Sequence, residues 1–501
     1  MKPLSWIRRS APIWRRWVMG NKWQTYRLGD IADIGSSKRI KMADYVSVGV
    51  PFYRSKEIIE KHKGNPISTE LFITEEKFNS IRERFGAPSA GDILLTSVGT
   101  LGIPYQVTNA DHFYFKDGNL TWFQNFKTSV NSRYLYFWLT SKIAKSKIDE
   151  VTIGSTQQAL TIVALKSITI DLPPISIQNE IVKHIDSVSD KITLNRQINQ
   201  TLEQMAQALF KSWFVDFDPV VDNALDAGFF DLDLAFPDEL LHRAEARRAV
   251  RERGDFKPLP NATRKLFPAA FEECAEPSLG LGGWVPKGWQ VQSIKDFANV
   301  TDFVANGSFA ALKENVTLFD NPEYALYIRT TDFKNDFDKE KAKYIDKHAY
   351  DFLSKTKLSG AEVIISNVGD VGTVFRPPSW LGIPMTLGSN AIAISTRCLN
   401  DYLYFYFSSQ AGQSAIDGIV SGSAQQKFNK TGFRSLRLLL PDNNVVTKFN
   451  EVYQDISLKI ISNKQNIRHL EQLRDTLLPK LISGELRLDN IEADLTTEEV
   501  A

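Results

Sequence analysis

The sequence predicts an α+β protein with two tandem mixed α/β domains, each followed by a long helix. The two helices are expected to pair as an antiparallel coiled coil with pseudo-twofold symmetry. Three observations support this prediction: an internal duplication, short β-rich runs punctuated by Gly, Asp and Asn, and two stretches of helical apolar periodicity. At 501 residues the chain is also too long for one ordinary hydrophobic core.

The duplication is long, and its segments keep their order. The matched pairs are GDILLTSVGTLG (91–102) with AEVIISNVGDVG (361–372), YLYFWLTS (134–141) with YLYFYFSS (402–409), GSTQQ (154–158) with GSAQQ (422–426), and KITLNRQINQTLEQM (191–205) with KIISNKQNIRHLEQL (459–473). From Tyr134 onward the offset is fixed at 268 residues. A tandem duplication of about 190 residues explains this order.

The duplication also sets the expected segments of the chain. Residues 1–18 carry five positive and no negative charges, and we interpret them as a start-site artefact or a disordered basic arm. The remaining segments are a first domain (19–175), a first helix (176–215), an acidic linker (216–285), a second domain (286–441), a second helix (442–483) and a C-terminal tail (484–501).

Both long helices carry an apolar stripe whose members are three or four residues apart. A helix of about 40 residues is near 60 Å long, and such a stripe favours a helical partner over a local core. The alternative is that each helix packs on its own domain. Asn195 and Asn463 correspond in the duplication and interrupt both stripes. We hypothesise that they meet and fix the register of the pair, although both could equally be exposed.

Charge and motifs exclude several classes of function. The net charge is +1, with roughly +4 on residues 19–175, +2 on 286–441 and −6 on 215–285. Two distant cysteines and six scattered histidines show no metal-ligand spacing, and no phosphate-binding loop or hydrolase motif is present. No apolar run is long enough to span a membrane. We therefore expect no catalytic residues, no metal and no membrane association.

Small and polar residues recur where the two domains match. We interpret these residues, together with nearby basic ones, as DNA-binding candidates, because amide, hydroxyl and guanidinium donors suit phosphate and base-edge contacts. The alternatives are a turn that closes a sheet and ordinary structural hydrogen bonds. The candidates are Lys38, Arg39, Arg54, Ser97, Thr100, Thr156, Gln157 and Gln158 in the first domain, and Arg329, Asn367, Asp370, Gln425 and Gln426 in the second.

Three further segments carry a family resemblance. They are ALFKSWFVDFDPV (208–220), LFPAAFEECAEPSLGLGGWVPKGWQV (266–291) and LRDTLLPKLISGEL (473–486). Together with the duplicated motifs, they closely resemble the specificity subunits of type I restriction-modification systems. The resemblance spans the chain from Met19 to about Leu486, and the acidic insert around 219–262 departs from it.

The resemblance implies a non-catalytic, cytoplasmic subunit that reads double-stranded DNA. Two target recognition domains would each bind half of an asymmetric, bipartite site, held apart by the helices. Two modification subunits would carry S-adenosylmethionine and methylate adenine, and restriction subunits would use ATP and Mg to cleave. No cofactor is expected on this chain. Leu202, Leu470, Trp213 and Phe214 are candidate subunit-interface residues, although the two aromatic residues could instead pack on their own domain.

Two other functions remain open from the residues alone. The first is a single-chain methyltransferase or nuclease, which the missing cofactor and acidic motifs disfavour. The second is a coiled-coil scaffold with two protein-binding domains and no role in DNA recognition.

Overall fold

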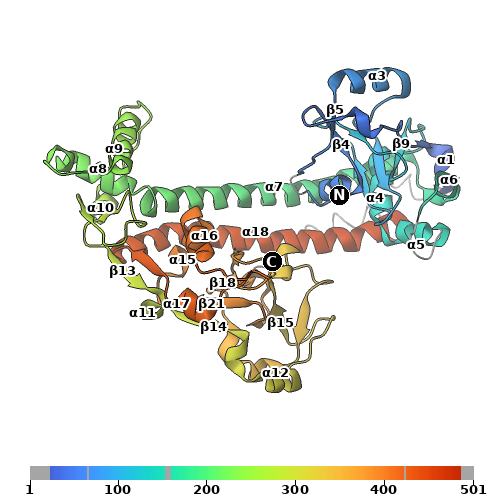
Figure 1. Cartoon of the computed structure of the whole chain (residues 1–501). Coiled ribbons are helices and arrows are strands. Elements are labelled where there is room, and N and C mark those ends of the chain that lie inside the picture. The colour runs from blue at the N-terminus through green and yellow to red at the C-terminus, as the bar shows by residue number, and fades with distance from the viewer. Residues whose placement is uncertain (1–22, 65–66, 153–158, 423–424, 487–501) are drawn as a thin grey trace, which may run out of the picture. The chain divides into compact units, whose positions relative to one another are not determined.

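The computed structural model describes residues 23–64, 67–152, 159–422 and 425–486 (Figure 1). The predictions for Thr156, Gln157 and Gln158 lie outside these residues. The chain divides into two units: unit 1 comprises Met1–Thr193 and Arg468–Ala501, and unit 2 comprises Leu194–Ile467. Each unit therefore holds one domain with parts of both long helices.

Unit 1 contains two four-stranded sheets. The strands of the first, in spatial order, are β2 (Asp33–Gly35), β9 (Leu120–Gln124), β6 (Ile93–Thr96) and β7 (Pro104–Gln106), all antiparallel. Those of the second are β3 (Tyr45–Val46), β5 (Phe72–Ile73), β4 (Val50–Tyr53) and β8 (Tyr114–Phe115). Strands β4 and β8 run parallel, and a further pair, β1 (Gln24–Arg27) with β10 (Thr169–Leu172), is antiparallel.

Unit 2 repeats the order of the first sheet, but in its second sheet the parallel pair lies in the middle instead of at one edge. Its first sheet has the order β14 (Asn299–Asp302), β21 (Ala391–Ser395), β18 (Val363–Ser366) and β19 (Val374–Phe375). Its second has the order β16 (Lys343–Ile345), β15 (Ala325–Ile328), β20 (Met385–Leu387) and β17 (Lys357–Leu358), in which β15 and β20 run parallel. Strands β13 (Gln290–Ser293) and β22 (Arg437–Leu440) form the equivalent antiparallel pair.

Helices cover the sheets of both units. In unit 1 they are α1 (Leu28–Ile31), α2 (Ser55–Lys63), α3 (Glu75–Phe85), α4 (Ser132–Thr140), α5 (Lys142–Val151) and α6 (Ile162–Ser167). In unit 2 they are α11 (Ile294–Phe297), α12 (Phe309–Asn315), α13 (Thr330–Lys334), α14 (Lys347–Phe352), α15 (Asn400–Ser408), α16 (Gln410–Asp417) and α17 (Lys430–Arg434). The aromatic faces of α4 and α15 are buried in the main core of their unit, as helices without a polar face require.

The two long helices are α7 (Ile175–Phe214) and α18 (Asn443–Ser483), of 40 and 41 residues. In unit 1, Ile181 and Ile185 of α7 share a core with Leu481 and Leu478 of α18. In unit 2, Trp213 packs on Phe449. In unit 2, Asn199 also contacts Asn463, so residue numbers rise along one helix as they fall along the other, and the predicted antiparallel pairing is confirmed.

The register of this pairing differs from the prediction by one helical turn. Asn463 is buried, as expected, but its Nδ2 donates to Oδ1 of Asn199 at 2.8 Å, so Asn195 was the wrong partner. The offset of 268 makes Asn199 equivalent to Ile467, and Asn463 equivalent to Asn195. The pseudo-twofold axis therefore passes near Gln197 and its equivalent, Gln465.

The segment 216–285, expected as an acidic linker, contains helices and strands. It contains α8 (Asp218–Asp226), α9 (Asp238–Arg251), α10 (Asn261–Arg264) and the strand pair β11 (Phe271–Glu273) with β12 (Trp284–Pro286). Val220, Val221 and Leu240 lie fully buried in the core of unit 2. Burial of these side chains stabilises a folded segment where charge alone favours a solvated one.

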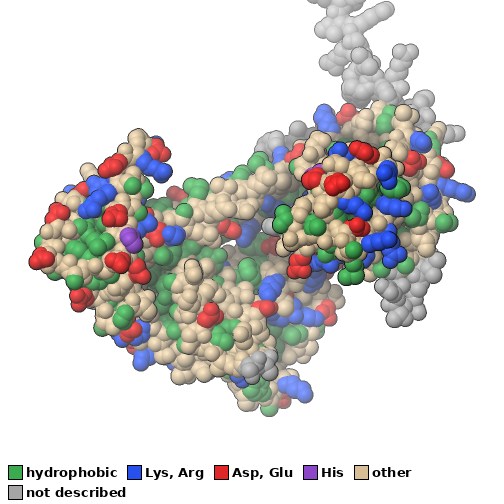
Figure 2. Space-filling model, turned by 45° about the horizontal axis from the view of Figure 1, so that its top comes forward, with side chains coloured by type: hydrophobic (Ala, Val, Ile, Leu, Met, Phe, Trp, Pro, Cys, Tyr) green, Lys and Arg blue, Asp and Glu red, His purple; other side chains and the backbone are tan. Residues whose placement is uncertain are grey.

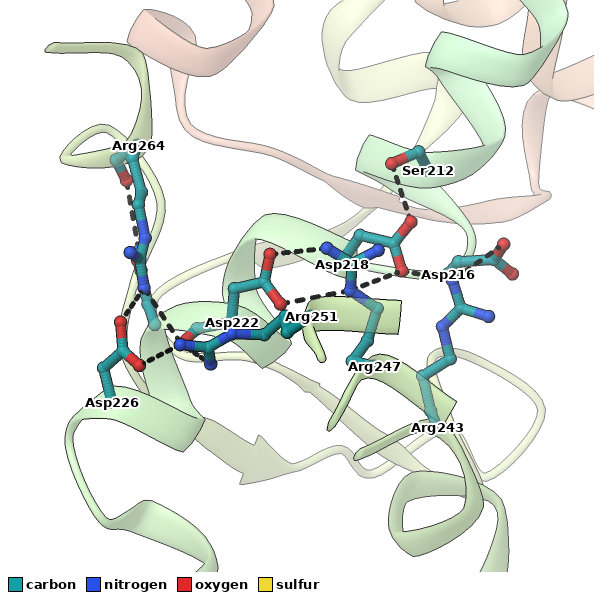
Figure 3. A network of polar contacts seen from close by, with 10 residues as sticks. Ser212, Asp216, Asp218, Asp222, Asp226, Arg243, Arg247, Arg251 and Arg264 are labelled. Carbon is teal, nitrogen blue, oxygen red and sulfur yellow. Dashed lines mark hydrogen bonds and ion pairs between the residues drawn. The ribbon is translucent and has the colours of Figure 1, made fainter. Parts of the chain in front are cut away.

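An acid–base ladder joins α8 to α9 (Figure 3). Aspartates spaced four apart on α8 meet arginines spaced four apart on α9, in the same order along both helices; the pairs are Asp218 with Arg243, Asp222 with Arg247, and Asp226 with Arg251. Arg264 of α10 adds a second partner for Asp226. Figure 2 shows the resulting mixture of acidic and basic side chains over the insert, at the left of the view.

Trp213 and Phe214 are buried in the core of unit 2. The Phe214 ring packs edge-on against the Tyr402 ring, with 5.2 Å between the ring centres. They are thus covered within this chain, and they pack on the second domain rather than on the domain that precedes them. Their prediction as subunit-interface residues is corrected accordingly. Leu202 and Leu470 are partly exposed on their helices. No helix in the described part of the chain is long and apolar enough to cross a membrane.

Candidate nucleic-acid interface

Four loops of unit 1 meet where its sheets end, and we call them edge 1: residues 36–39, 54–55, 97–102 and 116–119. The Ser36 Oγ accepts a hydrogen bond from the Gly118 N–H at 3.2 Å. The Ser97 N–H donates to the Asn119 carbonyl at 2.8 Å, and the Ser55 Oγ donates to the same carbonyl at 3.4 Å. Segments far apart in the sequence therefore form one polar surface.

Unit 2 has an equivalent surface, edge 2: residues 329–334, 367–372, 388–390 and 425–428. The Asn367 N–H donates to the Asn390 carbonyl at 3.1 Å, as its counterpart Ser97 does to Asn119. The Gly388 N–H donates to the Ile328 carbonyl at 2.8 Å. In unit 1 the Lys116 N–H makes the same bond to Tyr53 at 2.9 Å, so the two edges share their backbone framework.

The loops at 97–102 and 367–372 share a conformation that needs glycine. Gly99 and Gly369 have φ of 80° and 81°, and Gly102 and Gly372 have φ of 75° and 86°. These values lie in the left-handed region of backbone conformation, which glycine adopts freely and residues with a Cβ atom rarely adopt. The residues between the glycines are free to differ, and they do: Thr100 in unit 1 stands where Asp370 stands in unit 2.

An arginine follows the parallel-paired strand in each domain. Arg54 comes directly after β4 and Arg329 directly after β15, and each stands at the start of a helix. In both domains a carboxylate three residues after the arginine pairs with the guanidinium, and only 1% of the acid's side chain is exposed. These acids are Glu57 and Asp332. The hydrogen bond to its acid raises the pKa of each guanidinium above its ordinary value.

Lys38 and Arg39 belong to edge 1 through their backbone and side chains. The Lys38 N–H donates to the Tyr114 hydroxyl at 2.8 Å, and its ammonium lies 4.8 Å from the centre of the Phe85 ring. Arg39 is strongly exposed and lies 4.0 Å from Asp117. An exposed pair at that distance contributes little to stability, so Arg39 can exchange partners readily.

The predicted polar candidates divide into exposed and buried residues. Thr100 and Asp370 are exposed, and Asp370 pairs with Lys334 of α13 at 2.6 Å. Ser97 is buried, and its hydroxyl lies 2.6 Å from that of Thr121. Ser97 therefore holds the loop in place and does not offer its side chain to DNA, which corrects its prediction as a contact.

Gln425 and Gln426 are both exposed beside the glycine loop of unit 2. The Gly369 N–H donates to the Gln426 carbonyl at 3.3 Å, which holds this segment against 367–372. The side-chain amides are thus available at edge 2, as the prediction of a polar ligand requires.

Three buried polar atoms at the edges have no hydrogen-bond partner among the described residues. They are Nε of Arg54, Oγ1 of Thr330 and Oδ1 of Asn367. Buried polar atoms are almost always paired, because an unpaired one loses its hydration without replacement. These atoms are shielded from solvent, so an ordered water within the fold would supply the missing partners.

Sequence reasoning missed the acids that hold the arginines and the lysine that meets Asp370. The pattern Arg-x-x-Glu at Arg54 and Arg-x-x-Asp at Arg329 was a detectable signal, since an acid three residues into a helix commonly caps it. Lys334 had no such signal, because its contact with Asp370 depends on tertiary structure.

The protein is thus a duplicated α/β protein in which each domain is followed by a long helix and carries an equivalent polar surface. Residues 20–204 and 286–477 both match the family model described as the type I restriction modification DNA specificity domain. Together the two matches cover most of the chain, so the chain belongs to this family of specificity subunits.

The chain is also similar to individual proteins. The specificity subunit of the type I restriction enzyme HindI from Haemophilus influenzae is 26% identical over 350 residues, which cover 66% of this chain and 72% of that protein. The MjaIX specificity subunit from Methanocaldococcus jannaschii is 24% identical over 474 residues, 94% of each chain. Among solved structures, the S subunit of a type I system from M. genitalium aligns over 93% of this chain and 97% of its own, with 12% identity and a TM-score of 0.48.

Proposed function

We propose that this chain reads a bipartite, asymmetric DNA sequence, with edge 1 on one half-site and edge 2 on the other. The observation that carries the proposal is the pair of edges with a shared backbone framework and different exposed side chains. Thr100 offers a hydroxyl where Asp370 offers a carboxylate, and these groups favour different base edges. Two related domains with different reading groups suit an asymmetric site.

The paired helices suit a spacer between the two domains. A 40-residue helix is about 60 Å long, enough to span half-sites one turn of DNA apart, which is about 34 Å. Antiparallel pairing of duplicated helices would let one chain present two related domains at the two ends of the spacer. In this way a single chain can act as a symmetric dimer would, while reading two different half-sites.

We propose further that the catalytic work belongs to partners: two modification subunits that bind S-adenosylmethionine, and restriction subunits that use ATP and Mg. On α7, Leu194 and Met205 are more than half exposed, and eleven residues place them on one face of the helix. A helix from a modification subunit would cover such a face. The assembly would work in the cytoplasm, on the host's DNA and on DNA that enters the cell.

The test is a domain exchange. Residues 23–172 would be replaced by the corresponding domain of another family member, and methyladenine would be mapped across the genome of cells that express the chimera with its modification subunits. We expect one half-site to change while the other half and the spacer are retained. A chimera that methylates the original sequence, or that changes both halves, would contradict the proposal. A scaffold without a DNA role predicts no effect on the sequence.

A second measurement concerns the partners. The net charge of the chain is only +1, so phosphate attraction by this chain alone is weak. We expect the isolated chain to bind its site less tightly than the assembly with modification subunits at physiological salt. Equal affinity would show that this chain completes the interface on its own.

A further inference from the structure

Arg54 of edge 1 and Arg329 of edge 2 share one arrangement of charged side chains. Each follows the strand of a parallel pair, and each is held by an acid three residues on. The acid differs in length, Glu57 in unit 1 and Asp332 in unit 2, yet both reach the guanidinium and both also accept from the arginine's own N–H, at 2.8 and 2.9 Å. The same arginine–acid pair thus occurs in two domains that differ at other exposed positions, such as Thr100 and Asp370.

The acids are almost fully buried while the arginines are not. Arg54 keeps 40% of its side chain exposed and Arg329 keeps 26%. Burying a carboxylate is costly unless it is paired and hydrogen-bonded, so removal of the arginine alone would leave the buried acid without compensation and destabilise the fold. The arrangement therefore fixes a positive charge at the surface with little freedom to move.

The hydrogen bonds leave Nη1 of each guanidinium available. Arg329 uses Nε and Nη2 on Asp332, at 3.0 and 2.5 Å, and Nη2 also donates to the Lys341 carbonyl. Arg54 uses Nη2 on Glu57 at 3.0 Å, and its Nε is buried. Within the described residues, Nη1 of both arginines remains without a partner. A bidentate contact with a guanine needs donors on two adjacent nitrogens. On Arg329 the bonds to Asp332 and Lys341 occupy Nε and Nη2, and on Arg54 Nε is buried and one N–H of Nη2 is held by Glu57.

From these contacts we infer that Arg54 and Arg329 are equivalent anchors for the DNA backbone, each donating from Nη1 to a phosphate oxygen without reading sequence. A contact that carries no sequence information can be shared by two domains that read different half-sites. The inference rests on the proposed function, since it assigns these residues a task within the DNA interface.

The test removes each charged pair while keeping its hydrogen bonding. The variants are Arg54→Gln with Glu57→Gln in unit 1, and Arg329→Gln with Asp332→Asn in unit 2. The matched control is Arg376→Gln with Asp401→Asn, because Arg376 also pairs with a carboxylate at 2.5 Å and also has a buried, unpartnered Nε. Arg376 follows β19 at the end of the sheet away from the 367–372 loop. Thermal unfolding of each variant verifies that it is folded.

DNA affinity is measured for the chain assembled with its modification subunits, on a duplex with the mapped site and on an unrelated duplex, over a range of salt. We expect each edge variant to bind both duplexes about tenfold more weakly. The negative slope of log K against log salt should become shallower by about 0.9, as for one lost phosphate contact. The methylated sequence should not change.

Two results would overturn the inference. One is an affinity equal to that of the Arg376 and Asp401 control, which would make the pinned arginines structural. The other is altered base preference in one half-site with unchanged binding to unrelated DNA, which would make them base readers. Failure of the proposed function is a separate result, because the wild-type assembly would then recognise no bipartite site.

Discussion

Single amide residues set the register of the helix pair in unit 2. Asn199 and Asn463 are both buried, and each supplies the partner that the other needs. A buried amide pair stabilises one alignment over others, because any shift along the helix leaves two amides unpaired in an apolar seam. This explains why polar residues interrupt an otherwise apolar stripe.

The substitution Asn463→Ala should lower the free energy of unfolding by about 1–3 kcal/mol, because Asn199 remains buried without its partner. Urea denaturation measures the difference. Asn195→Ala is the matched control, since it makes the same change on the same kind of helix; we expect an effect within about 0.5 kcal/mol. A larger loss for Asn195→Ala than for Asn463→Ala would contradict the observed register.

At the scale of elements, the insert shows how charge can build structure instead of preventing it. The ion pairs between α8 and α9 follow one another along both helices, and apolar residues beneath them join the core of unit 2. Asp222 and Arg247 are largely buried and make two hydrogen bonds, at 3.1 and 2.6 Å. Bidentate pairs of this kind fix geometry as well as contribute energy.

The ladder predicts a stability that depends on pH. The hydrogen bond from Arg251, together with that from Arg264, lowers the pKa of Asp226 below its ordinary value. A carboxylate whose pKa is depressed by folding stabilises the fold above its unfolded pKa, near 3.9, and loses that contribution as pH falls through the folded pKa. The melting temperature of Asp226→Asn should therefore be lower than that of wild type at pH 6, and the difference should shrink toward pH 3.

The control for this experiment is Asp233→Asn, which changes an exposed carboxylate in the same insert. We expect its melting temperature to follow that of wild type across the same pH range. A constant difference between Asp226→Asn and wild type from pH 6 to 3 would show that Asp226 does not contribute through its charge.

At the scale of the whole molecule, the duplication and the register together constrain the helix pair. The pseudo-twofold axis passes near Gln197 and Gln465, so equal insertions after these two residues keep every other helix contact in register. An insertion in only one helix misaligns the contacts on one side of the axis, including those of Ile181 with Leu481 or those of Trp213 with Phe449.

We therefore expect seven helical residues inserted after both Gln197 and Gln465 to give a folded chain with a longer recognised spacer. Seven residues add about 10 Å of helix, close to the rise of three base pairs. Binding to duplexes with different spacers measures the change. The same insertion after Gln197 alone should destabilise the protein. An unchanged spacer preference in the double insertion would contradict the proposed role of the helices.

Much of the fold was predictable because its signals are local. Pro173 and Pro174 end β10 before α7 begins, and the apolar spacing of three and four continues to the end of the helix. Glycines that need left-handed backbone appear in both copies, so the equivalent loops could be recognised. The candidate site was predicted only in part, because composition cannot separate the buried Ser97 from the exposed Thr100.

The sequence alone determined the duplication, the two α/β domains and the long helices, since each depends on patterns within one segment or on direct comparison of two segments. Tertiary structure alone decided which residues meet. It paired Asn463 with Asn199 instead of Asn195, joined the aspartates of α8 to the arginines of α9, and buried Trp213 and Phe214 against the second domain. The physical reason is that such contacts depend on the packing of distant surfaces, and a shift of one helical turn leaves the periodicity of either helix unchanged.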